Sequence, residues 1–484
     1  MKRVIVATWG NPFQWEPIKY KYNRIELKSR NTLPITIKAL NPDKVLIIAV
    51  DTVANLTAKG GVKPKIEGRE FNSYQDVVED ARERIKWHIT EEVIPELEKE
   101  DKELVDRISE MLKEGRIEID IAPGVGVFGN ITVEGNMLDF YHYITYDLSK
   151  WLPVDNVEVY LDLTHGINFM PTLTYRALRN LLGLLAYTRN VSFEVINFEP
   201  YPLGVKKEIR EKTVLNMREI GEGKVSPRPL LSKVENEEWT AFISAVANGF
   251  PLVFSAFYPN IREVRKHLEE KLQRFLEGVK IEKREDGVPR VIRMKELSKS
   301  FKNTSKLYYL LRALKDDYPK FNLKYKQEKG LTIDDIGKIT NLFRGLPRIW
   351  AILDAQVEDI ENMIKGYSYL EGTRQEYRKG IIDRINEKRR GNRDGAVGKL
   401  RKGSSVSLGE ARSALKIFGL GGDNKDAKEE IKLRNFIAHS GFEYNVTLLK
   451  YNRIRNDILI YYKEKDKVKQ LACEALTYGG GKDV

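Results

Sequence analysis

The first 200 residues alternate between two hydrophobic patterns. Short runs rich in Val and Ile, nearly continuous in apolar residues, predict buried strands at Arg3–Thr8, Lys44–Val50, Ile117–Ala122, Val157–Leu163 and Val191–Phe198. Between these runs, apolar residues recur at helical spacing over Tyr74–Leu112, Met137–Trp151 and Phe169–Tyr187. Strand–helix alternation is typical of a doubly wound, mostly parallel sheet. We therefore expect an α/β, Rossmann-like domain over residues 1–200, with ligands bound beyond the carboxyl ends of its strands.

The pattern changes after residue 200. Prolines and glycines between residues 201 and 235 indicate a connector. From residue 236 to 484 the periodicity is helical, which predicts an all-α domain. Helices are expected at Val264–Leu276, Leu307–Leu314, Ile349–Ile364 and Glu410–Phe418. Ser407 precedes the last of these and has the spacing of a capping box with Glu410.

One uncharged segment, Trp239–Ile261, is long enough to cross a bilayer. Asn248, Gly249 and Pro251 interrupt its middle. The interpretation that fits both features is a pair of buried helices that meet at this corner, because helices that are apolar all round are typical of large cores.

Charge favours an anionic partner. The chain has 484 residues, 82 Lys and Arg against 70 Asp and Glu, and a net charge of +12, which places nucleic acid first among the candidates. Its single cysteine, Cys473, excludes an internal disulfide framework and multi-cysteine zinc modules. The apolar run at the N-terminus is too short for a signal peptide, so we expect a cytoplasmic protein that does not enter a membrane.

The most basic stretch is Arg374–Lys402, with eleven Lys or Arg residues. Two interpretations remain open. It is either a solvated charged surface or a loop that contacts phosphates, in which case Arg389, Arg390 and Arg393 are the RNA-binding candidates.

Polar residues gather where predicted strands end. They are Trp9, Gly10 and Asn11 after the first strand, Asp51 and Thr52 after the second, and Thr164, His165, Gly166 and Asn168 after the fourth. Trp9 offers a ring for base stacking, Thr164 is placed to cap the following helix, and its first-turn N–H groups would face a ligand. We expect these residues to bind a nucleotide-type ligand, although they are also the polar turns that such a sheet needs.

A literal G-x-G-x-x-G spans Gly124–Gly129, but the residues after it do not open a helix. The helix N-terminus that holds a pyrophosphate is then missing, which argues against nicotinamide or flavin binding. The five histidines are far apart and no H-E-x-x-H motif or P-loop occurs, so neither a metal centre nor P-loop ATP hydrolysis is expected.

The segment Leu433–Ser440 contains Arg434, Asn435 and His439. On a helix, Asn435 and His439 share a face, with Arg434 one position earlier. A histidine moves protons near neutral pH and an arginine grips a phosphate with two hydrogen bonds. These groups suit metal-independent RNA cleavage by the substrate's own 2′-hydroxyl, although R-x4-H alone is a weak pattern.

In this order the parts resemble a known family. Trp9-Gly10-Asn11-Pro12 and Asp162-Leu163-Thr164-His165-Gly166 resemble the motifs of a CARF domain, and Arg434-Asn435-Phe436-Ile437-Ala438-His439 resembles the motif of a HEPN ribonuclease domain. The pair is similar to the accessory ribonucleases of type III CRISPR systems, which act in antiviral defence.

The resemblance implies an endoribonuclease that cleaves single-stranded RNA and leaves 2′,3′-cyclic phosphate ends. It implies allosteric activation by a cyclic oligoadenylate, with cyclic tetra-adenylate the first ring to test, and a homodimer or higher even oligomer. His439 would transfer protons, Arg434 would bind the phosphate and Asn435 would orient the partners. The alternative is a nucleic-acid-binding regulator with a nucleotide-sensing domain and no catalysis.

Overall fold

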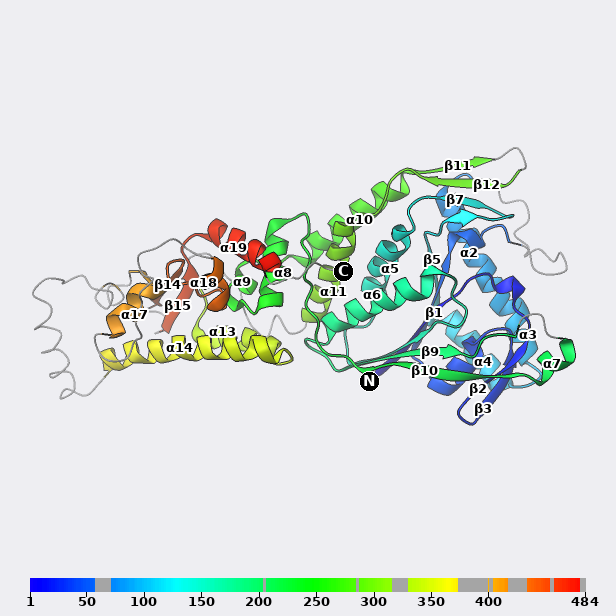
Figure 1. Cartoon of the computed structure of the whole chain (residues 1–484), viewed down its shortest axis with the longest axis horizontal. Coiled ribbons are helices and arrows are strands. Elements are labelled where there is room, and N and C mark those ends of the chain that lie inside the picture. The colour runs from blue at the N-terminus through cyan, green and yellow to red at the C-terminus, as the bar shows by residue number, and fades with distance from the viewer. Residues whose placement is uncertain are drawn as a thin grey trace, which may run out of the picture. The chain divides into compact units, whose positions relative to one another are not determined.

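The computed structural model describes residues 1–56, 71–202, 206–283, 287–315, 330–372, 399, 404–416, 433–452 and 457–478. The chain divides into two compact units. The first comprises Met1–Arg228 and Arg262–Ala313, and the second comprises Pro229–Ile261 and Leu314–Val484. Figure 1 colours both units along the chain, and each is described by itself below.

The first unit is built on a mixed sheet with the strand order β3-β2-β10-β9-β8-β1-β4-β5. Its strands are β1 (Lys2–Thr8), β2 (Ile18–Tyr22), β3 (Ile25–Ser29), β4 (Lys44–Val50), β5 (Ile117–Ala122), β8 (Val157–Asp162), β9 (Val191–Phe198) and β10 (Val214–Lys224). Strands β5, β4, β1, β8 and β9 are parallel, whereas β10 is antiparallel to β9 and β2 is antiparallel to β3. From β1 the chain winds outward through β4 and β5, and then through β8 and β9 on the other side. The topological switch point therefore falls between β1 and β8.

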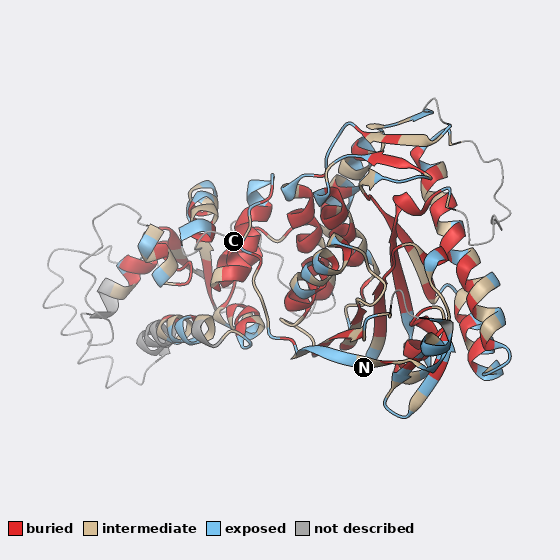
Figure 2. Ribbon diagram, turned by 45° about the vertical axis from the view of Figure 1, so that its right-hand side comes forward, coloured by how far each residue is buried: buried red, intermediate tan, exposed pale blue. Residues whose placement is uncertain are grey.

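Helices cover both faces of this sheet (Figure 1). One face carries α1 (Leu33–Leu40), α2 (Tyr74–Trp87), the π-helical η3 (His88–Val93), α3 (Ile94–Leu97) and α4 (Lys102–Lys113), and the other carries α5 (Leu138–Trp151) and α6 (Phe169–Leu185). Side chains alternate along β1, because Ile5 and Ala7 join the first core and Val4 and Val6 join the second. Both faces are buried, as the red strands of Figure 2 show, which explains why the strands are almost entirely apolar.

A later part of the chain returns to the first unit. It contains α10 (Ile261–Leu276), β11 (Val279–Lys283), β12 (Pro289–Arg293) and α11 (Lys299–Leu314). Strand β12 pairs with β7 (Thr132–Glu134), which pairs with β6 (Gly126–Val127), in a second sheet of order β11-β12-β7-β6. The sequence pattern places α10 and α11 in the helical half. It does not reveal that Arg293, at the end of β12, is buried against Asp51 in the first unit.

The second unit is mainly helical. Its helices are α8 (Glu237–Asn248), α9 (Pro251–Ala256), α13 (Ile333–Thr340), α14 (Pro347–Gly372), α17 (Leu408–Lys416), α18 (Leu433–Ala438) and α19 (Lys465–Tyr478). A small sheet of order β13-β14-β15 accompanies them, formed by β13 (Val406–Ser407), β14 (Thr447–Asn452) and β15 (Asp457–Tyr462). The predicted fold class is confirmed, an α/β first part followed by a helical region, but the expectation of helical periodicity alone over residues 236–484 was wrong at this sheet and at β11 and β12.

Two local predictions in the second unit are confirmed. Both arms of the capping box form, since Ser407 Oγ accepts from Glu410 N–H at 3.1 Å and Glu410 Oε2 accepts from Ser407 N–H at 2.9 Å. The uncharged segment forms α8 and α9, with Gly249 at φ 71° as the left-handed cap between them. Among the described residues, no helix combines the length and apolarity that a membrane span requires.

The predicted connector contains regular structure. Residues Lys207–Lys212 form α7, and Val214–Lys224 form β10. Gly221 and Gly223 lie at φ 127° and 79°, next to a register shift between Glu219 and Gly221 in the β9–β10 ladder. These glycines suggested a loop, but here they form an irregularity inside a strand.

Candidate functional site

The turns after β1 and β8 meet at the switch point. Gly10 N–H donates to the carbonyl oxygen of His165 at 2.8 Å. A Cβ atom at Gly10 would lie 2.5 Å from Cγ2 of Ile167, and one at Gly166 would overlap Oγ1 of Thr8. Both positions therefore favour glycine, because a Cβ atom there would overlap the side chains of Ile167 and Thr8.

His165 is held beneath these turns in its neutral form. Its Nε2 accepts a hydrogen bond from Thr32 N–H at 3.2 Å, and its ring packs against Trp15 with 4.2 Å between centroids. Burial, with a smaller contribution from nearby His88, lowers the pKa of His165 to about 3. At neutral pH the ring is therefore uncharged and carries its proton on Nδ1, so it cannot attract phosphate as a cation.

Asp162 and Thr164 form hydrogen bonds with each other and with neighbouring residues. One carboxylate oxygen of Asp162 accepts from Thr164 N–H at 2.9 Å and from its hydroxyl at 2.6 Å, and the other accepts from the Thr32 hydroxyl at 2.5 Å. Thr164 Oγ1 also accepts from Phe198 N–H at 3.1 Å. Burial raises the pKa of Asp162, although these bonds oppose the shift. Thr164 therefore ties β8 to β9, and the prediction that it caps the next helix was wrong.

Two exposed or half-buried asparagines border the same turns. Asn11 Oδ1 accepts from Phe13 N–H at 3.1 Å and caps the 3-10 turn η1 (Pro12–Gln14). Asn168 is exposed at the N-terminus of α6, adopts φ 46° and makes no side-chain cap bond.

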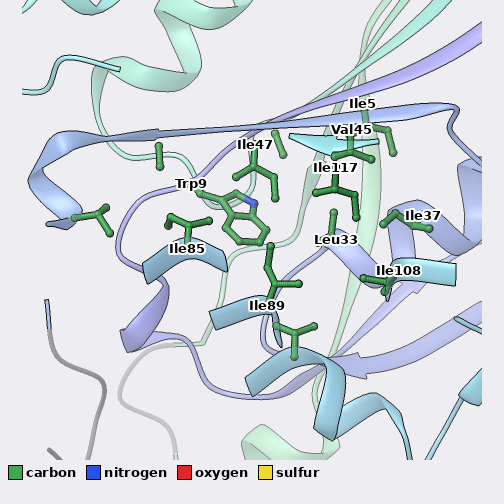
Figure 3. Close-up of a cluster of buried hydrophobic side chains, with 14 of the residues drawn as sticks. Ile5, Trp9, Leu33, Ile37, Val45, Ile47, Ile85, Ile89, Ile108 and Ile117 are labelled. Carbon is green, nitrogen blue, oxygen red and sulfur yellow. The ribbon is translucent and has the colours of Figure 1, made fainter. Parts of the chain in front are cut away.

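Trp9 does not present a ring to solvent. It is 1% exposed and belongs to the core between the sheet and α2, near Ile85 and Ile89 (Figure 3). Trp15 meets it edge-on, with ring centroids 5.4 Å apart. The expected stacking platform at Trp9 is therefore covered by protein, because the apolar end of β1 continues into the core.

Asp51 and Thr52 also differ from expectation. Asp51 is fully buried, where it accepts from Tyr74 Oη at 2.8 Å, from Gly124 N–H at 2.8 Å and from Arg293 Nη1 at 3.0 Å. Burial raises the pKa of Asp51, against the opposing effect of Arg293. Arg293 Nε lies 3.6 Å from Asp139 Oδ2, so one cation serves two carboxylates. Asp51 is thus a structural anchor that no incoming ligand reaches.

Thr52, the neighbour of Asp51, contributes its backbone to the same region. It is 7% exposed, and its carbonyl oxygen accepts from Asn130 Nδ2 at 3.0 Å. This bond fixes the loop after β4 to the segment between β6 and β7.

Two further features lie near these turns, a pair of buried polar atoms at the end of β1 and a cavity on the β9 side of β8. Buried Oγ1 of Thr8 and Nε1 of Trp9 have no hydrogen-bond partner within the described part of the chain. A cavity of about 530 Å³ opens beside the end of β8 and the first turns of α6. Leu163, Pro171, Tyr175, Val195 and Ile220 are among the residues that line it.

The residues that contact the His165 ring were not predicted from the sequence. Trp15 lies just before β2 and Thr32 just after β3, and the pattern did not single out either position. Asn31 accepts from Leu33 N–H at 3.0 Å, and Pro34 follows at the start of α1. The sequence Asn-Thr-Leu-Pro is a helix-start signal that could have located this loop.

The second cluster lies around α18 in the second unit. Arg434 is exposed on this helix, and Phe436 is fully buried against Phe250, with ring centroids 5.1 Å apart. His439 N–H donates to the carbonyl oxygen of Asn435 at 3.0 Å, so the helical bonding extends one residue beyond the end of α18. Asn435 and His439 thus share a face, as the spacing predicts.

The His439 ring is held from two sides. Nδ1 lies 3.1 Å from Oε1 of Gln356 on α14, and the Tyr444 ring packs against the imidazole with 4.6 Å between centroids. Arg412 of α17 donates to the Tyr444 hydroxyl and lies 3.2 Å from Asp359, also on α14. We call Gln356, Asp359, Arg412, His439 and Tyr444 the His439 network. None of the partners of His439 was identified from sequence, because they lie 83 residues before it or just beyond the motif.

The RNA-binding candidates Arg389, Arg390 and Arg393 lie outside the described residues.

Comparisons with known proteins address the family. Residues 4–200 match the model of the CARF domain of the CRISPR system endoribonuclease Csx1. The CRISPR system endoribonuclease Csx1 of Methanocaldococcus jannaschii is 27% identical over 483 residues, which cover 92% of this chain and 86% of that protein. Among solved structures, Enterococcus italicus Csm6 bound to cyclic hexa-2′-fluoro-hexa-dAMP aligns over 99% of this chain and 93% of its own, at 13% identity and a TM-score of 0.23.

The family match covers the whole parallel core of the sheet, from β1 to β9. It therefore includes both turns that meet at the switch point, and the Csx1 relative extends the similarity over most of the remaining chain. These similarities support placing the chain among the CRISPR-associated CARF accessory ribonucleases, with the match to the CARF domain at residues 4–200.

Proposed function

We propose that this protein is a metal-independent endoribonuclease of the HEPN type, which cleaves single-stranded RNA when a cyclic oligoadenylate binds its CARF domain in type III CRISPR defence. The sensor would be residues 1–200, and the nuclease would lie within residues 236–484. The relative named an endoribonuclease supports the reaction class, and the His439 network supports the place where it occurs.

The chemistry follows from the groups around α18. The 2′-hydroxyl of RNA loses its proton to an imidazole nitrogen, its oxygen bonds to phosphorus, and the bond from phosphorus to the 5′-oxygen breaks. The leaving oxygen takes up a proton, so the products are a 2′,3′-cyclic phosphate and a 5′-hydroxyl. His439 would move protons, exposed Arg434 would stabilise the phosphorane with charge-assisted hydrogen bonds, and Asn435 would orient the reacting groups.

A homodimer would complete the cleft. Arg434 is exposed on its helix, whereas His439 is drawn toward Gln356 of α14. We propose that two copies of this motif face each other across a two-fold axis, so that a second His439 supplies the proton to the leaving oxygen.

The activator would bind at the switch point between β1 and β8. The turns that carry Gly10 and Gly166 meet at this edge, and exposed Asn168 borders it. Because His165 is neutral, we propose that it shapes the site and donates from Nδ1, while Asn11 and Asn168 contact the ligand.

The single observation that carries the proposal is the His439 ring, held by a side-chain amide beside an exposed arginine. The test is cleavage of labelled single-stranded RNA with each cyclic oligoadenylate added separately, in excess EDTA, with product ends identified by mass spectrometry. We expect cleavage with one ring size, preferably cyclic tetra-adenylate, and 2′,3′-cyclic phosphate ends. Binding of RNA without any cleavage would favour the alternative, a non-catalytic regulator.

A further inference from the structure

The His439 network contains a residue with a defined chemical task. We propose that Gln356 is a positioning residue that holds the proton of His439 on Nδ1, so that Nε2 is the nitrogen that takes the 2′-hydroxyl proton. The inference rests on the proposed function, and it adds the residue that determines which nitrogen reacts.

A hydrogen bond joins the Gln356 side chain to the His439 ring. Oε1 of Gln356 lies 3.1 Å from Nδ1 of His439. A carbonyl oxygen only accepts, so the Nδ1 of a neutral ring must be the donor and Nε2 must hold the lone pair. The nitrogen that takes the proton is then the one that points away from α14.

Tyr444 holds the His439 ring from a second side. Tyr444 packs against the imidazole, and Arg412 ties the Tyr444 hydroxyl to Asp359. Asp359 and Gln356 are three residues apart on α14 and so share one side of that helix. One helix therefore holds the ring directly through Gln356 and indirectly through Asp359, Arg412 and Tyr444. A ring fixed in this way loses little rotational freedom when the substrate binds.

An amide suits the position beside Nδ1 of His439 better than a carboxylate. A carboxylate beside Nδ1 would favour the imidazolium and raise its pKa, whereas an amide fixes the tautomer with no added charge. The described charged groups of the network, Arg412 and Asp359, pair with each other at 3.2 Å. Their opposite charges partly offset each other, and a charge introduced at residue 356 would lie directly beside Nδ1.

The experiment is a pH–rate profile of activated RNA cleavage by the full-length protein. The variants are Gln356→Glu, Gln356→Leu and the matched control Gln470→Glu, which places the same charge at an exposed position of α19. Gln356→Glu should move the ascending limb of the profile to higher pH by about one unit, because the new carboxylate stabilises protonated His439. Gln356→Leu should lower kcat by about 3–10-fold with KM unchanged, the effect of one neutral hydrogen bond.

The possible outcomes separate this inference from the proposed function. A purely structural role for Gln356 predicts a lower melting temperature with an unmoved pH profile, and that result would overturn the inference. Should Gln470→Glu shift the profile equally, the shift would be a general charge effect, and the inference would also fail. If His439→Ala cleaves RNA as fast as the wild type, the proposed function fails instead, whatever the Gln356 variants do.

Discussion

The strand-end turns of the first unit and the His439 network of the second contain similar residue types but use them differently. At the strand ends, the carboxylates of Asp51 and Asp162 are buried and bonded within the fold. Around α18, Arg434 is exposed, and Nδ1 of His439 lies within hydrogen-bond distance of the Gln356 side chain. The difference teaches that polar side chains after buried strands stabilise the sheet first.

Substitutions in the two regions should therefore have different consequences. Changes at the buried strand ends should act through folding stability, and changes around α18 should act through the rate of the reaction. The predictions below test this contrast.

The largest effect is expected at the buried ion pair. Asp51→Ala leaves Arg293 with the Gly124 carbonyl oxygen and with the carboxylate of Asp139, 3.6 Å away, in a site without solvent exposure. Removing one partner of such a pair costs about 3–5 kcal/mol, which urea unfolding followed by circular dichroism measures. The matched control is Asp155→Ala, which breaks the exposed pair with Lys2 and should cost less than about 1 kcal/mol. Equal losses in both variants would contradict the structural role of Asp51.

Arg434→Ala should lower the cleavage rate and leave the folding stability nearly unchanged. We expect it to leave the unfolding free energy within about 0.5 kcal/mol, because the side chain is exposed. RNA cleavage at saturating activator should fall about 10–100-fold, the effect of losing hydrogen bonds to a charged phosphate. Arg434→Lys should recover only part of the rate, since an ammonium lacks the paired donors of a guanidinium. Unchanged cleavage by Arg434→Ala would remove this residue from the site.

His165 gives the first unit a pH-dependent stability. The unfolded ring titrates near its ordinary pKa of about 6.5, whereas the native ring resists protonation down to about 3. The stabilising contribution is therefore complete above pH 6.5 and falls as the pH drops toward 3, by about 1.4 kcal/mol per pH unit. His165→Gln should lose less stability between pH 7 and 5 than the wild type in urea titrations. Parallel losses in the two proteins would show that the ring titrates normally.

The smallest effect is expected at Asn11. Asn11→Ala loses the bond to Phe13 N–H and a proposed ligand contact. We expect the activator midpoint to rise about three- to tenfold with the maximal rate nearly unchanged, because one neutral hydrogen bond is lost. Asn156→Ala is the control. Asn156 makes a similar bond to Asn190 N–H just before β8, at the amino ends of the parallel strands, whereas Asn11 lies at their carboxyl ends. A midpoint that shifts equally in both variants would argue against a ligand contact at Asn11.

Much of the fold could be predicted because two buried faces impose a strong pattern. The strands Lys44–Val50, Ile117–Ala122 and Val191–Phe198 have the predicted bounds, since each is nearly continuous in apolar residues. The hairpin β2–β3 was missed because its side chains alternate between buried Ile18 and Tyr20 and exposed Lys19 and Lys21, within a polar segment. A half-exposed strand at the edge of a sheet gives a weaker signal than a buried one.

Part of the site was predicted, because local spacing determines which residues share a helix face or an edge of the sheet. Spacing along one helix placed Asn435 and His439 on a shared face, and turns after parallel strands placed Gly10 near Gly166. Spacing could not show that Arg293 returns from another part of the chain to bury Asp51, or that Gln356 reaches His439. Such contacts depend on tertiary packing, which local periodicity does not encode.

The most direct test of the central claim is the rate of RNA cleavage by His439→Ala in excess EDTA, at saturating cyclic oligoadenylate. His267→Ala, on α10, serves as the matched control. The account predicts that the wild type and the control cleave equally in EDTA, and that His439→Ala is slower by about 10²–10⁴-fold with an unchanged melting temperature. Cleavage that persists in His439→Ala, or that EDTA abolishes in the wild type, would contradict it.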